Sequence, residues 1–449
     1  MNIPNAYMDK QAQLLIKNDE VSKELFDEYG VKKGLRDETG AGVLTGLTHV
    51  STIRSFKMVD GVKTPCDGEL RYRGYNIFDI VQDAAGKRLI YDEAAYLLLF
   101  GELPSEKELT RYKGVIAELM QLPTNFTRDV IMKAPSEDIM NSMTRSILTL
   151  ASYDDRKDDL SVPNVLRQSM MLIAVFPMLA VYAYHAHNHY DLDNSMYIHR
   201  ADPSLTTPEN FLRLLRPDMK YTELEAKALD AALLLHMEHG GGNNSTFTTR
   251  VVTSAGTDTY SAIAAAMSSL KGNKHGGANL QVMRMMDDIR EHISDYNDRD
   301  EVAEYVRKIV RKEAYDHKGL VYGMGHAVYS LSDPREVILK RFVEPLAAAK
   351  GRTDDLALYR NVEITAPQVI AEERKIYKGV CPNVDFYSGF VYEMLGIPRE
   401  LFTPLFAIAR IVGWSAHRLE ELVTMDKIIR PAYRSVAEDR EFIPFDQRD

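Results

Sequence analysis

The sequence has little cysteine and lacks common metal-binding and secretion signals. Its 449 residues include two cysteines, Cys66 and Cys381, which stand in different contexts. A disulfide framework is therefore not expected, and a reducing compartment is. No CxxC or HExxH spacing occurs, so no metal site is predicted. The N-terminal residues MNIPNAYMDKQAQLL lack the basic start and apolar run of a signal peptide. These absences favour a cytoplasmic protein.

Basic residues are also in the minority. The chain has 65 acidic and 55 basic residues and a formal net charge of −10, so its composition does not indicate a basic face for nucleic acid. Hydrophobic residues make up 45% of the chain and charged residues 27%, which is typical of a soluble globular protein.

One stretch is apolar enough to suggest a membrane span. It runs from Met170 to Tyr184 and is interrupted by Pro177, and it is shorter than the roughly 20 residues that a bilayer requires. We interpret it as a buried core helix or a helix at a subunit interface, and we predict no membrane association. His185 and His189 follow it four residues apart and could bind a metal, so a metal-dependent lyase is one alternative function.

Helical periodicity dominates the rest of the chain. Strand patterns are limited to a possible hairpin at residues 50–73. Three helix starts are marked by capping residues: Ser105 with Glu108, Thr207 with Pro208, and Thr222 with Glu225. The sequence therefore predicts a mainly α fold.

The character of the helices suggests two domains. Between residues 277 and 392 the predicted helices are shorter and more highly charged, and apolar core patterns resume after Gly396. We therefore predict a small helical domain at 277–392, inserted in a large helical domain made of residues 1–276 and 393–449.

The stretch from His236 to Asn279 carries two histidines in matching contexts. His239 and His275 are each followed at once by glycine, and each is predicted to lie near the C-terminal end of a helix. Glycine accepts the left-handed backbone of a helix exit and permits close approach of a ligand. Two imidazoles at two such bends indicate a site.

Further chemistry-bearing residues follow in order. His326 lies in the glycine-bracketed segment GMGHAVYSLSDPR, with Arg335 nine residues later, and Asp385 lies in CPNVDFYSG. Each residue alone is more often a cap, a core residue or a surface charge than a functional group. The ordered set is what indicates a site.

The ordered motifs resemble the citrate synthase family, which includes the 2-methylcitrate synthases. The resemblance covers nearly the whole chain through RYRGY, HGGGNNSTFTTR, KGNKHGGAN, GMGHAVYSLSDPR and PNVDFYSG, together with Arg410 and Arg430. It implies a two-domain, mainly α fold, a small domain that closes over the large one, and a homodimer with active sites between the domains.

The chemistry of that family explains the residue types. Removing a proton from the methyl group of an acyl thioester requires a base and a hydrogen-bond donor aimed at the thioester oxygen. The ketone that is attacked must be polarised, and its dicarboxylate needs cations, for which bidentate arginine is well suited.

Roles for individual residues follow from the resemblance. It implies that Asp385 is the base, that His275 donates to the thioester oxygen, and that His326 polarises the ketone of oxaloacetate. The remaining residues would bind the oxaloacetate carboxylates: His239, Arg335, Arg410 and, across the dimer interface, Arg430.

The leading hypothesis is an enzyme that makes citrate and free CoA from acetyl-CoA, oxaloacetate and water. Acetyl-CoA would be a co-substrate, and no permanently bound cofactor is implied. A 2-methylcitrate synthase that uses propionyl-CoA is the close alternative, because the two substrates differ by one methyl group. A helical binding protein that has lost activity is the alternative from another class.

Overall fold

The computed structural model describes residues 5–37, 42–83, 89–326, 328–375, 379–424 and 427–448. The chain forms two compact units, Met1–Leu47 and Thr48–Asp449. The first unit contains helices α1 (Asn5–Asp19) and α2 (Lys23–Glu28) and the short 3-10 helix η1 (Lys33–Leu35). The hydrophobic core cluster lies in the second unit.

The second unit is mainly helical, as the sequence predicts, and the strands among its described residues form one three-stranded sheet. In chain order its elements are β1 (Ser51–Val59), β2 (Val62–Tyr72), β3 (Tyr75–Asn76), α3 (Ile77–Asp83), α4 (Tyr91–Phe100), α5 (Glu106–Leu119), the π-helical turn η2 (Thr127–Ile131), α6 (Ile139–Leu150), η3 (Ala151–Tyr153), α7 (Val162–Tyr190), α8 (Thr207–Leu215), α9 (Glu223–His236), α10 (Asn244–Ser254), α11 (Thr259–Leu270), α12 (Ala278–His292), α13 (Arg299–Val310), α14 (Pro334–Lys350), α15 (Thr353–Arg374), α16 (Val384–Met394), η4 (Arg399–Leu401), α17 (Phe402–Thr424) and η5 (Phe445–Gln447).

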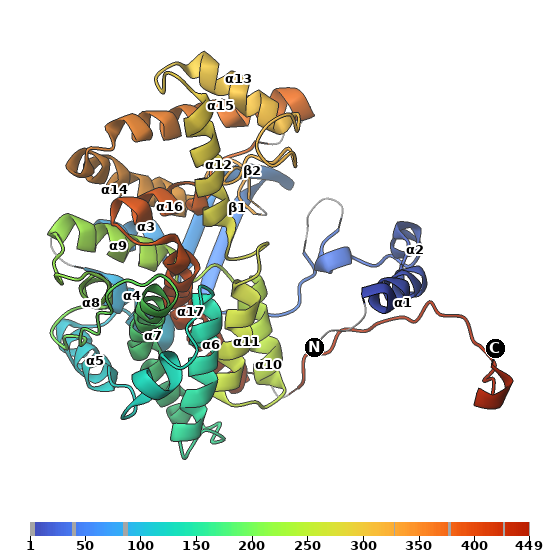
Figure 1. The fold of residues 1–449 in the computed structure, drawn as a ribbon, viewed down its shortest axis with the longest axis horizontal. Coiled ribbons are helices and arrows are strands. Elements are labelled where there is room, and N and C mark those ends of the chain that lie inside the picture. Colours follow the sequence, from blue (N-terminus) through green and yellow to red (C-terminus); the bar gives the residue numbers. More distant parts are fainter. Residues whose placement is uncertain are drawn as a thin grey trace. The chain divides into compact units, whose positions relative to one another are not determined.

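The helices of the second unit fall into two groups in space. Helices α12 to α16 gather at the top of Figure 1, and α4 to α11 lie below them around α17. Helix α17 packs against α7, α9 and α10, while α14 and α16 also contact α9. The division into domains at residues 277 and 392 stays a prediction.

Local capping signals place several helix starts. The capping boxes predicted at Ser105 with Glu108 and at Thr222 with Glu225 are both present. The predicted cap at Thr207 is wrong by one residue. Thr206 is the N-cap there, because its backbone and hydroxyl groups both donate to Glu209, and Thr207 is the first helical residue.

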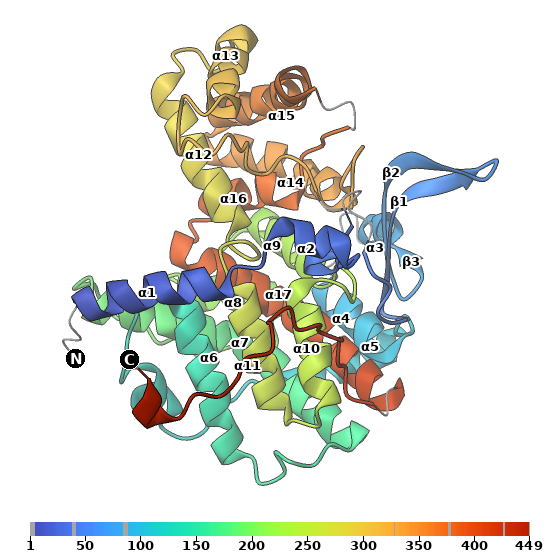
Figure 2. The same cartoon turned by 90° about the vertical axis from the view of Figure 1, so that its right-hand side faces the viewer.

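The predicted hairpin is confirmed. Strands β1 and β2 pair in antiparallel register from Ser51 opposite Tyr72 to Val59 opposite Val62. They are joined at Asp60 and Gly61, whose φ angles of 51° and 79° are those of a tight hairpin turn. Figure 2 shows the hairpin extending from the helical body.

Helix α7 contains the apolar run and extends well beyond it. It has 29 residues and continues through Pro177. Within the described part of the chain it is the one helix long and apolar enough to cross a membrane, yet 83% of its most apolar window is buried inside the fold. That burial fits the predicted core helix.

The end of α9 differs from the prediction. The helix ends at His236, three residues before His239, so His239 lies in the loop that follows rather than on the last helical turn. The chain enters the left-handed region only at Gly240, where φ is 87°.

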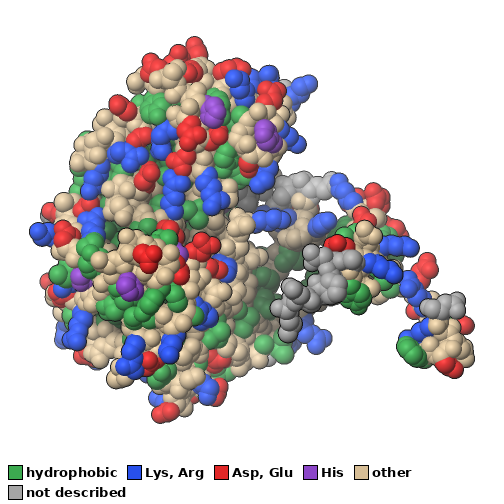
Figure 3. Space-filling view, in the orientation of Figure 1, with side chains coloured by type: hydrophobic (Ala, Val, Ile, Leu, Met, Phe, Trp, Pro, Cys, Tyr) green, Lys and Arg blue, Asp and Glu red, His purple; other side chains and the backbone are tan. Residues whose placement is uncertain are grey.

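Side chains of both charges are interspersed on the face of the second unit in Figure 3. The helix pair α13 and α15 is an example. One arginine on α13 and another directly after its last residue form ion pairs with acidic residues of α15. These ion pairs are Arg307 with Glu372 and Glu373, and Arg311 with Glu373.

Candidate active site

His239 and His326 come from distant motifs and lie against one another. Their ring centroids are 5.1 Å apart and the rings are nearly perpendicular. The hydroxyl group of Tyr329 lies 3.2 Å from His239 Nε2, and the Tyr329 ring stacks on His326 at 4.8 Å. Burial, followed by the charge of Arg335, lowers the pKa of His239 well below its usual value, so its ring is neutral.

The backbone around His326 selects the position of its ring proton. The N–H groups of Val328 and Tyr329 donate to His326 Nδ1 at 3.0 and 3.2 Å. Nδ1 is therefore an acceptor, and a neutral ring carries its proton on Nε2. Arg335 Nη2, which can only donate, lies 3.4 Å from Nε2, so two N–H groups face one another and a ligand oxygen between them could accept from both. His326 can thus donate a hydrogen bond from Nε2.

The loop of His326 is paired with the segment that leads to Asp385. Gly325 N–H donates to the carbonyl of Cys381 at 2.7 Å, and Asn383 donates to the carbonyls of both Gly323 and Gly325 at 2.9 Å. Gly323 has a φ of 80°, and a Cβ there would lie 2.9 Å from Val282. This pairing brings the GMGHAVYSLSDPR and PNVDFYSG motifs side by side.

Asp385 is a half-buried carboxyl group within reach of two cationic side chains. It lies in the first turn of α16, which begins after the N-cap Asn383. Burial raises the pKa of Asp385 to about 6, although Arg335 and Arg410 oppose that shift. A carboxylate with a raised pKa is a stronger base than an ordinary aspartate and is still ionised at neutral pH.

Arg335 and Arg410 are both buried. Arg335 begins α14 and is held by Asp333, the N-cap of that helix. Arg410 lies on α17, and its Nε donates to the carbonyl of His236 at 2.7 Å. Among the described residues no partner meets Arg410 Nη1, which is buried. A buried, unpartnered guanidinium N–H is costly, so a ligand carboxylate that accepts from it would be bound favourably.

His275 lies on the α10 side of the same region. Its Nε2 is 3.0 Å from the hydroxyl of Ser245 and 3.4 Å from the Ser245 N–H. Burial, and next the charge of Arg410, lower the pKa of His275 to about 4, so the ring is neutral at physiological pH. Phe406 contacts both His275, at 6.4 Å between ring centroids, and Arg410, whose guanidinium lies 4.7 Å from the Phe406 centroid.

Six of the seven predicted site residues therefore share one region of the second unit. Arg410 links them, because its charge acts on the pKa of His239, His275 and Asp385. Arg430 is the exception. It is exposed in the segment after α17, and Ile429 beside it donates to Ser254 at the end of α10. No hydrogen bond or ion pair joins Arg430 to any described residue of its own chain, and the individual roles stay predictions.

Four residues that hold the site together were not singled out from the sequence: Ser245, Glu238, Tyr329 and Asp333. Each lies within six residues of a predicted site residue, so the motifs themselves were the available signal. Their partners lie up to 187 positions away, which no local pattern reveals.

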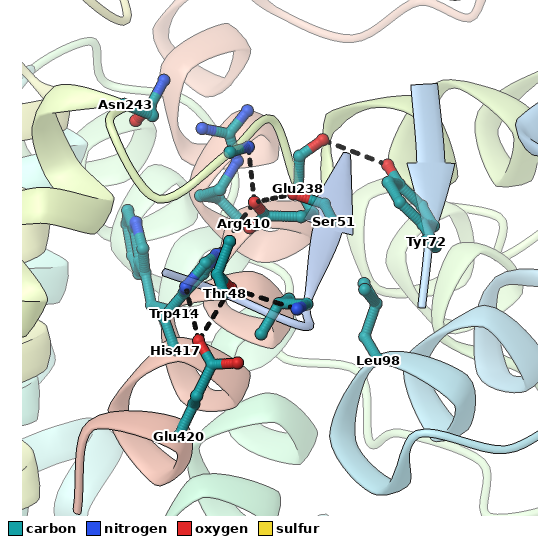
Figure 4. A network of polar contacts seen from close by, with 12 residues as sticks. Thr48, Ser51, Tyr72, Leu98, Glu238, Asn243, Arg410, Trp414, His417 and Glu420 are labelled. Carbon is teal, nitrogen blue, oxygen red and sulfur yellow. Dashed lines mark hydrogen bonds and ion pairs between the residues drawn. The ribbon is translucent and has the colours of Figure 1, made fainter. Parts of the chain in front are cut away.

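Glu238 joins three elements beneath His239. Its carboxylate accepts from the hydroxyl of Ser51 on β1 at 2.9 Å, from Gly240 N–H, and contacts His417 Nε2 on α17 at 2.9 Å. Figure 4 shows these groups converging from opposite sides. Burial opposes ionisation of Glu238, but His417 and Arg410 outweigh it and lower the pKa to about 2. The glutamate thus fixes the loop that carries His239.

The histidines after the apolar run are engaged elsewhere. His185 Nε2 lies 3.1 Å from the carbonyl of Leu214, and His189 Nδ1 lies 2.8 Å from the carbonyl of Asn194. Within the described ranges no group of three or more His, Cys, Asp or Glu side chains is placed to hold a metal ion. The geometry around His185 therefore does not support the metal-dependent lyase.

A mainly α fold that gathers histidines, two buried arginines and a carboxyl group of raised pKa in one region is typical of an enzyme with acid–base chemistry on an anionic substrate. A family model, "Citrate synthase, C-terminal domain", matches residues 39–432. The citrate synthase of Haloferax volcanii is 36% identical over 388 residues, 85% of this chain and 93% of its own. The 2-methylcitrate synthase of Shewanella oneidensis is 32% identical over 91% of this chain and 98% of its own.

Solved structures give the same result. Citrate synthase from Thermoplasma acidophilum, solved in a ternary complex with carboxymethyl coenzyme A and oxaloacetate, superposes with a TM-score of 0.75 at 27% identity, covering 93% of this chain and 99% of that one. Citrate synthase from Pyrobaculum aerophilum gives a TM-score of 0.73 at 28% identity, covering 91% and 94%. The chain belongs to the citrate synthase family, and it is an enzyme.

Proposed function

We propose that this enzyme condenses acetyl-CoA with oxaloacetate and water to give citrate and free CoA. The observation that carries the proposal is the placement of Asp385: its neighbour Val384 donates to Asp333, the ion-pair partner of Arg335, and the charges of Arg335 and Arg410 act on its carboxyl group, whose pKa burial raises to about 6. The family membership and the carboxymethyl-CoA and oxaloacetate complex of the Thermoplasma relative support it. CoA would enter as a co-substrate, with no permanently bound cofactor.

Oxaloacetate would bind first, between the two buried arginines. Its carboxylates would accept from Arg335 and from the unpartnered Nη1 of Arg410, and His239 would contribute a hydrogen bond. The ketone oxygen would accept from His326 Nε2–H, because the backbone donors on Nδ1 leave the proton there. The ketone carbon then becomes electron-poor and open to attack.

Asp385 would remove a proton from the acetyl methyl group. The electrons of that C–H bond move to the thioester oxygen, and a neutral His275 would stabilise this developing enolate by donating a hydrogen bond. The lowered pKa of His275 keeps its ring uncharged in the resting enzyme. The ring therefore acts as a neutral hydrogen-bond donor to the enolate and not as an acid.

The enolate carbon would next form a bond to the ketone carbon of oxaloacetate. The ketone oxygen takes up the proton and becomes the hydroxyl group of a citryl thioester. Water then attacks the thioester carbonyl, the carbon–sulfur bond breaks, and the thiol of CoA leaves with a proton. The net reaction consumes one water and yields citrate and CoA.

The decisive assay measures free thiol and citrate together. Purified enzyme given acetyl-CoA and oxaloacetate is expected to release thiol and citrate in equal amounts, and omission of oxaloacetate is expected to suppress both. Thiol release that does not depend on oxaloacetate would indicate a thioesterase. Binding of both compounds without turnover would indicate the helical binding protein instead.

Propionyl-CoA is the alternative acyl donor. The Shewanella relative, at 32% identity, is named for the 2-methylcitrate reaction. One methyl group in an apolar pocket changes binding by about 1–3 kcal/mol, a difference that a direct comparison of kcat/KM resolves. Faster turnover of propionyl-CoA than of acetyl-CoA would replace the acetyl assignment.

We further propose a cytoplasmic homodimer in which Arg430 reaches the site of the partner subunit. Arg430 is exposed, and so are Tyr433, Phe442 and Phe445, which are 95%, 82% and 84% exposed in the single chain. Aromatic side chains this exposed on one segment are typical of a surface that binds another chain. Both cysteines are free, which suits a reducing compartment.

Mixing two inactive variants tests the shared site. Asp385→Asn and Arg430→Ala are purified separately, then mixed under conditions that exchange subunits. If Arg430 acts in the partner, a mixed dimer contains one site with both intact residues, and activity appears on mixing. No gain on mixing would show that Arg430 acts in its own chain or not at all.

A further inference from the structure

Ser245 is the centre of a buried hydrogen-bond cluster behind His275. It is the second residue of α10, which begins at Asn244 after the N-cap Asn243, and it is fully buried. Three groups lie within hydrogen-bonding distance of its hydroxyl: His275 Nε2 at 3.0 Å, Asn243 Oδ1 at 2.9 Å and Trp414 Nε1 at 3.1 Å. A hydroxyl group has one proton and two acceptor positions, so these three contacts use its full capacity.

The contact with Trp414 limits the hydrogen bonds that the Ser245 hydroxyl can make. An indole N–H is a donor only, so it always occupies one acceptor position of the Ser245 oxygen. The hydroxyl proton must then go either to His275 Nε2 or to Asn243. The backbone N–H of Ser245, also a donor, lies 3.4 Å from His275 Nε2 and favours an Nε2 that accepts.

One assignment satisfies every group. As placed, Asn243 presents Oδ1 and would take the Ser245 proton; with its amide turned, the NH₂ group and Trp414 donate to the Ser245 oxygen, and the Ser245 hydroxyl donates to His275 Nε2, where the Ser245 N–H also donates. The amide orientation follows from the network, as it usually must for asparagine. The proton of the neutral His275 ring then lies on Nδ1, on the side away from Ser245.

We propose that Trp414 is a positioning residue: its indole N–H holds the Ser245 oxygen against His275 Nε2, so that the hydroxyl and N–H groups of Ser245 together fix the ring orientation and the Nδ1–H tautomer of His275. This inference rests on the proposed role of His275 as the donor to the thioester oxygen. The Trp414 side chain is fully buried, and Figure 4 shows its indole extending from α17 toward the loop that carries Asn243.

The position of Trp414 on α17 also relates its contact with Ser245 to other parts of the site. Arg410, Trp414 and His417 stand four and then three residues apart, which places them on one face of the helix. That face therefore carries Arg410, which is expected to bind oxaloacetate. It also carries Trp414, which contacts Ser245 behind His275, and His417, which contacts Glu238 below His239. Helix α17 thus fixes the relative positions of three parts of the site.

The test is a double-mutant cycle. Trp414→Phe keeps an aromatic ring and removes the N–H, and Ser245→Ala removes the hydroxyl through which we expect it to act. We expect Trp414→Phe to lower kcat about tenfold, with the KM for oxaloacetate unchanged. In the Ser245→Ala background the same change is expected to have no further effect on kcat. Tyr182→Phe, which removes a buried hydroxyl bonded to the carbonyl of His199, is the control and is expected to leave kcat unchanged.

A spectroscopic measurement covers the case in which Trp414→Phe does not fold. Trp414 is the single tryptophan of the chain, so the intrinsic indole fluorescence reports on it alone. We expect Ser245→Ala to change the emission maximum, because the indole N–H loses its acceptor, and Tyr182→Phe to leave it unchanged. An unchanged emission in Ser245→Ala would overturn the inference, as would equal effects of Trp414→Phe in both backgrounds.

The two proposals fail in different ways. If the wild-type enzyme makes no citrate, the proposed function is wrong, and the fluorescence of Ser245→Ala still tests the contact. If the wild-type enzyme is active and the two substitutions act independently, the proposed function stands and the role of Trp414 is refuted.

Discussion

Asp333 holds Arg335 by a two-pronged ion pair that is closed to solvent. Arg335 Nε and Nη2 donate to the two carboxylate oxygens at 3.0 and 2.7 Å, and the Arg335 backbone N–H donates to the same group. Val384 N–H, next to Asp385, also donates to Asp333 at 3.2 Å. Burial alone would raise the pKa of Asp333, but Arg335 keeps it below its usual value. One carboxylate thus positions both a proposed substrate ligand and the start of the helix that carries the proposed base.

Removing that charge is expected to be costly. Asp333→Asn leaves Arg335 buried without a counter-charge, and breaking a buried pair typically costs about 3–5 kcal/mol of stability. We expect a lower melting temperature and a higher KM for oxaloacetate. Asp129→Asn is the matched control, because Asp129 pairs with Arg128 on the surface and such pairs contribute about 0–1 kcal/mol. Equal melting temperatures for the two variants would contradict the prediction.

Replacing the proposed base separates binding from turnover. Asp385→Asn keeps the size of the side chain and removes its basicity, so we expect kcat to fall by about 10²- to 10⁴-fold. Oxaloacetate binding, measured by calorimetry, is expected to persist because the arginines and histidines are untouched. A decrease of only a few fold in kcat would show that another group removes the proton.

The acidic limb of the pH–rate profile follows from the same carboxyl group. Asp385 must be ionised to act, and its pKa is raised to about 6, so kcat/KM is expected to fall as the pH drops through about 6. His275, with a pKa lowered to about 4, stays neutral throughout this range and does not produce the limb. A profile that is flat from pH 7 down to 5 would contradict the assignment.

The hydroxyl group of Tyr329 is expected to tune oxaloacetate binding. Tyr329→Phe retains the ring that stacks on His326 and loses the contact with His239 Nε2, a neutral hydrogen bond of about 1 kcal/mol. We expect roughly a fivefold increase in the KM for oxaloacetate with little change in melting temperature. Tyr305→Phe, whose hydroxyl bonds Asp288 in the α12 and α13 pair, serves as the control. An unchanged KM in Tyr329→Phe would mean that His239 does not depend on this contact.

The sequence by itself determined the class of fold and pointed to six residues that the structure places in one region. Capping boxes such as Thr222 with Glu225 and the Asp60-Gly61 turn are local interactions, which a short pattern encodes completely. The ordered motifs around His239, His275, His326 and Asp385 likewise stand in the chain itself, and with the family resemblance they were enough to predict a citrate synthase. The end of α9 was predicted three residues too late, and Glu238, in the interval between His236 and His239, is bound to Ser51 and His417 from distant segments.

Only the tertiary structure decided how these residues are tuned. Trp414 meets Ser245 across 169 positions, and His417 meets Glu238 across 179, so neither contact leaves a trace in local spacing. The raised pKa of Asp385 and the neutral state of His275 have the same origin. Both depend on how much water the fold removes and which charges it leaves nearby, and these quantities exist only once distant segments are packed together.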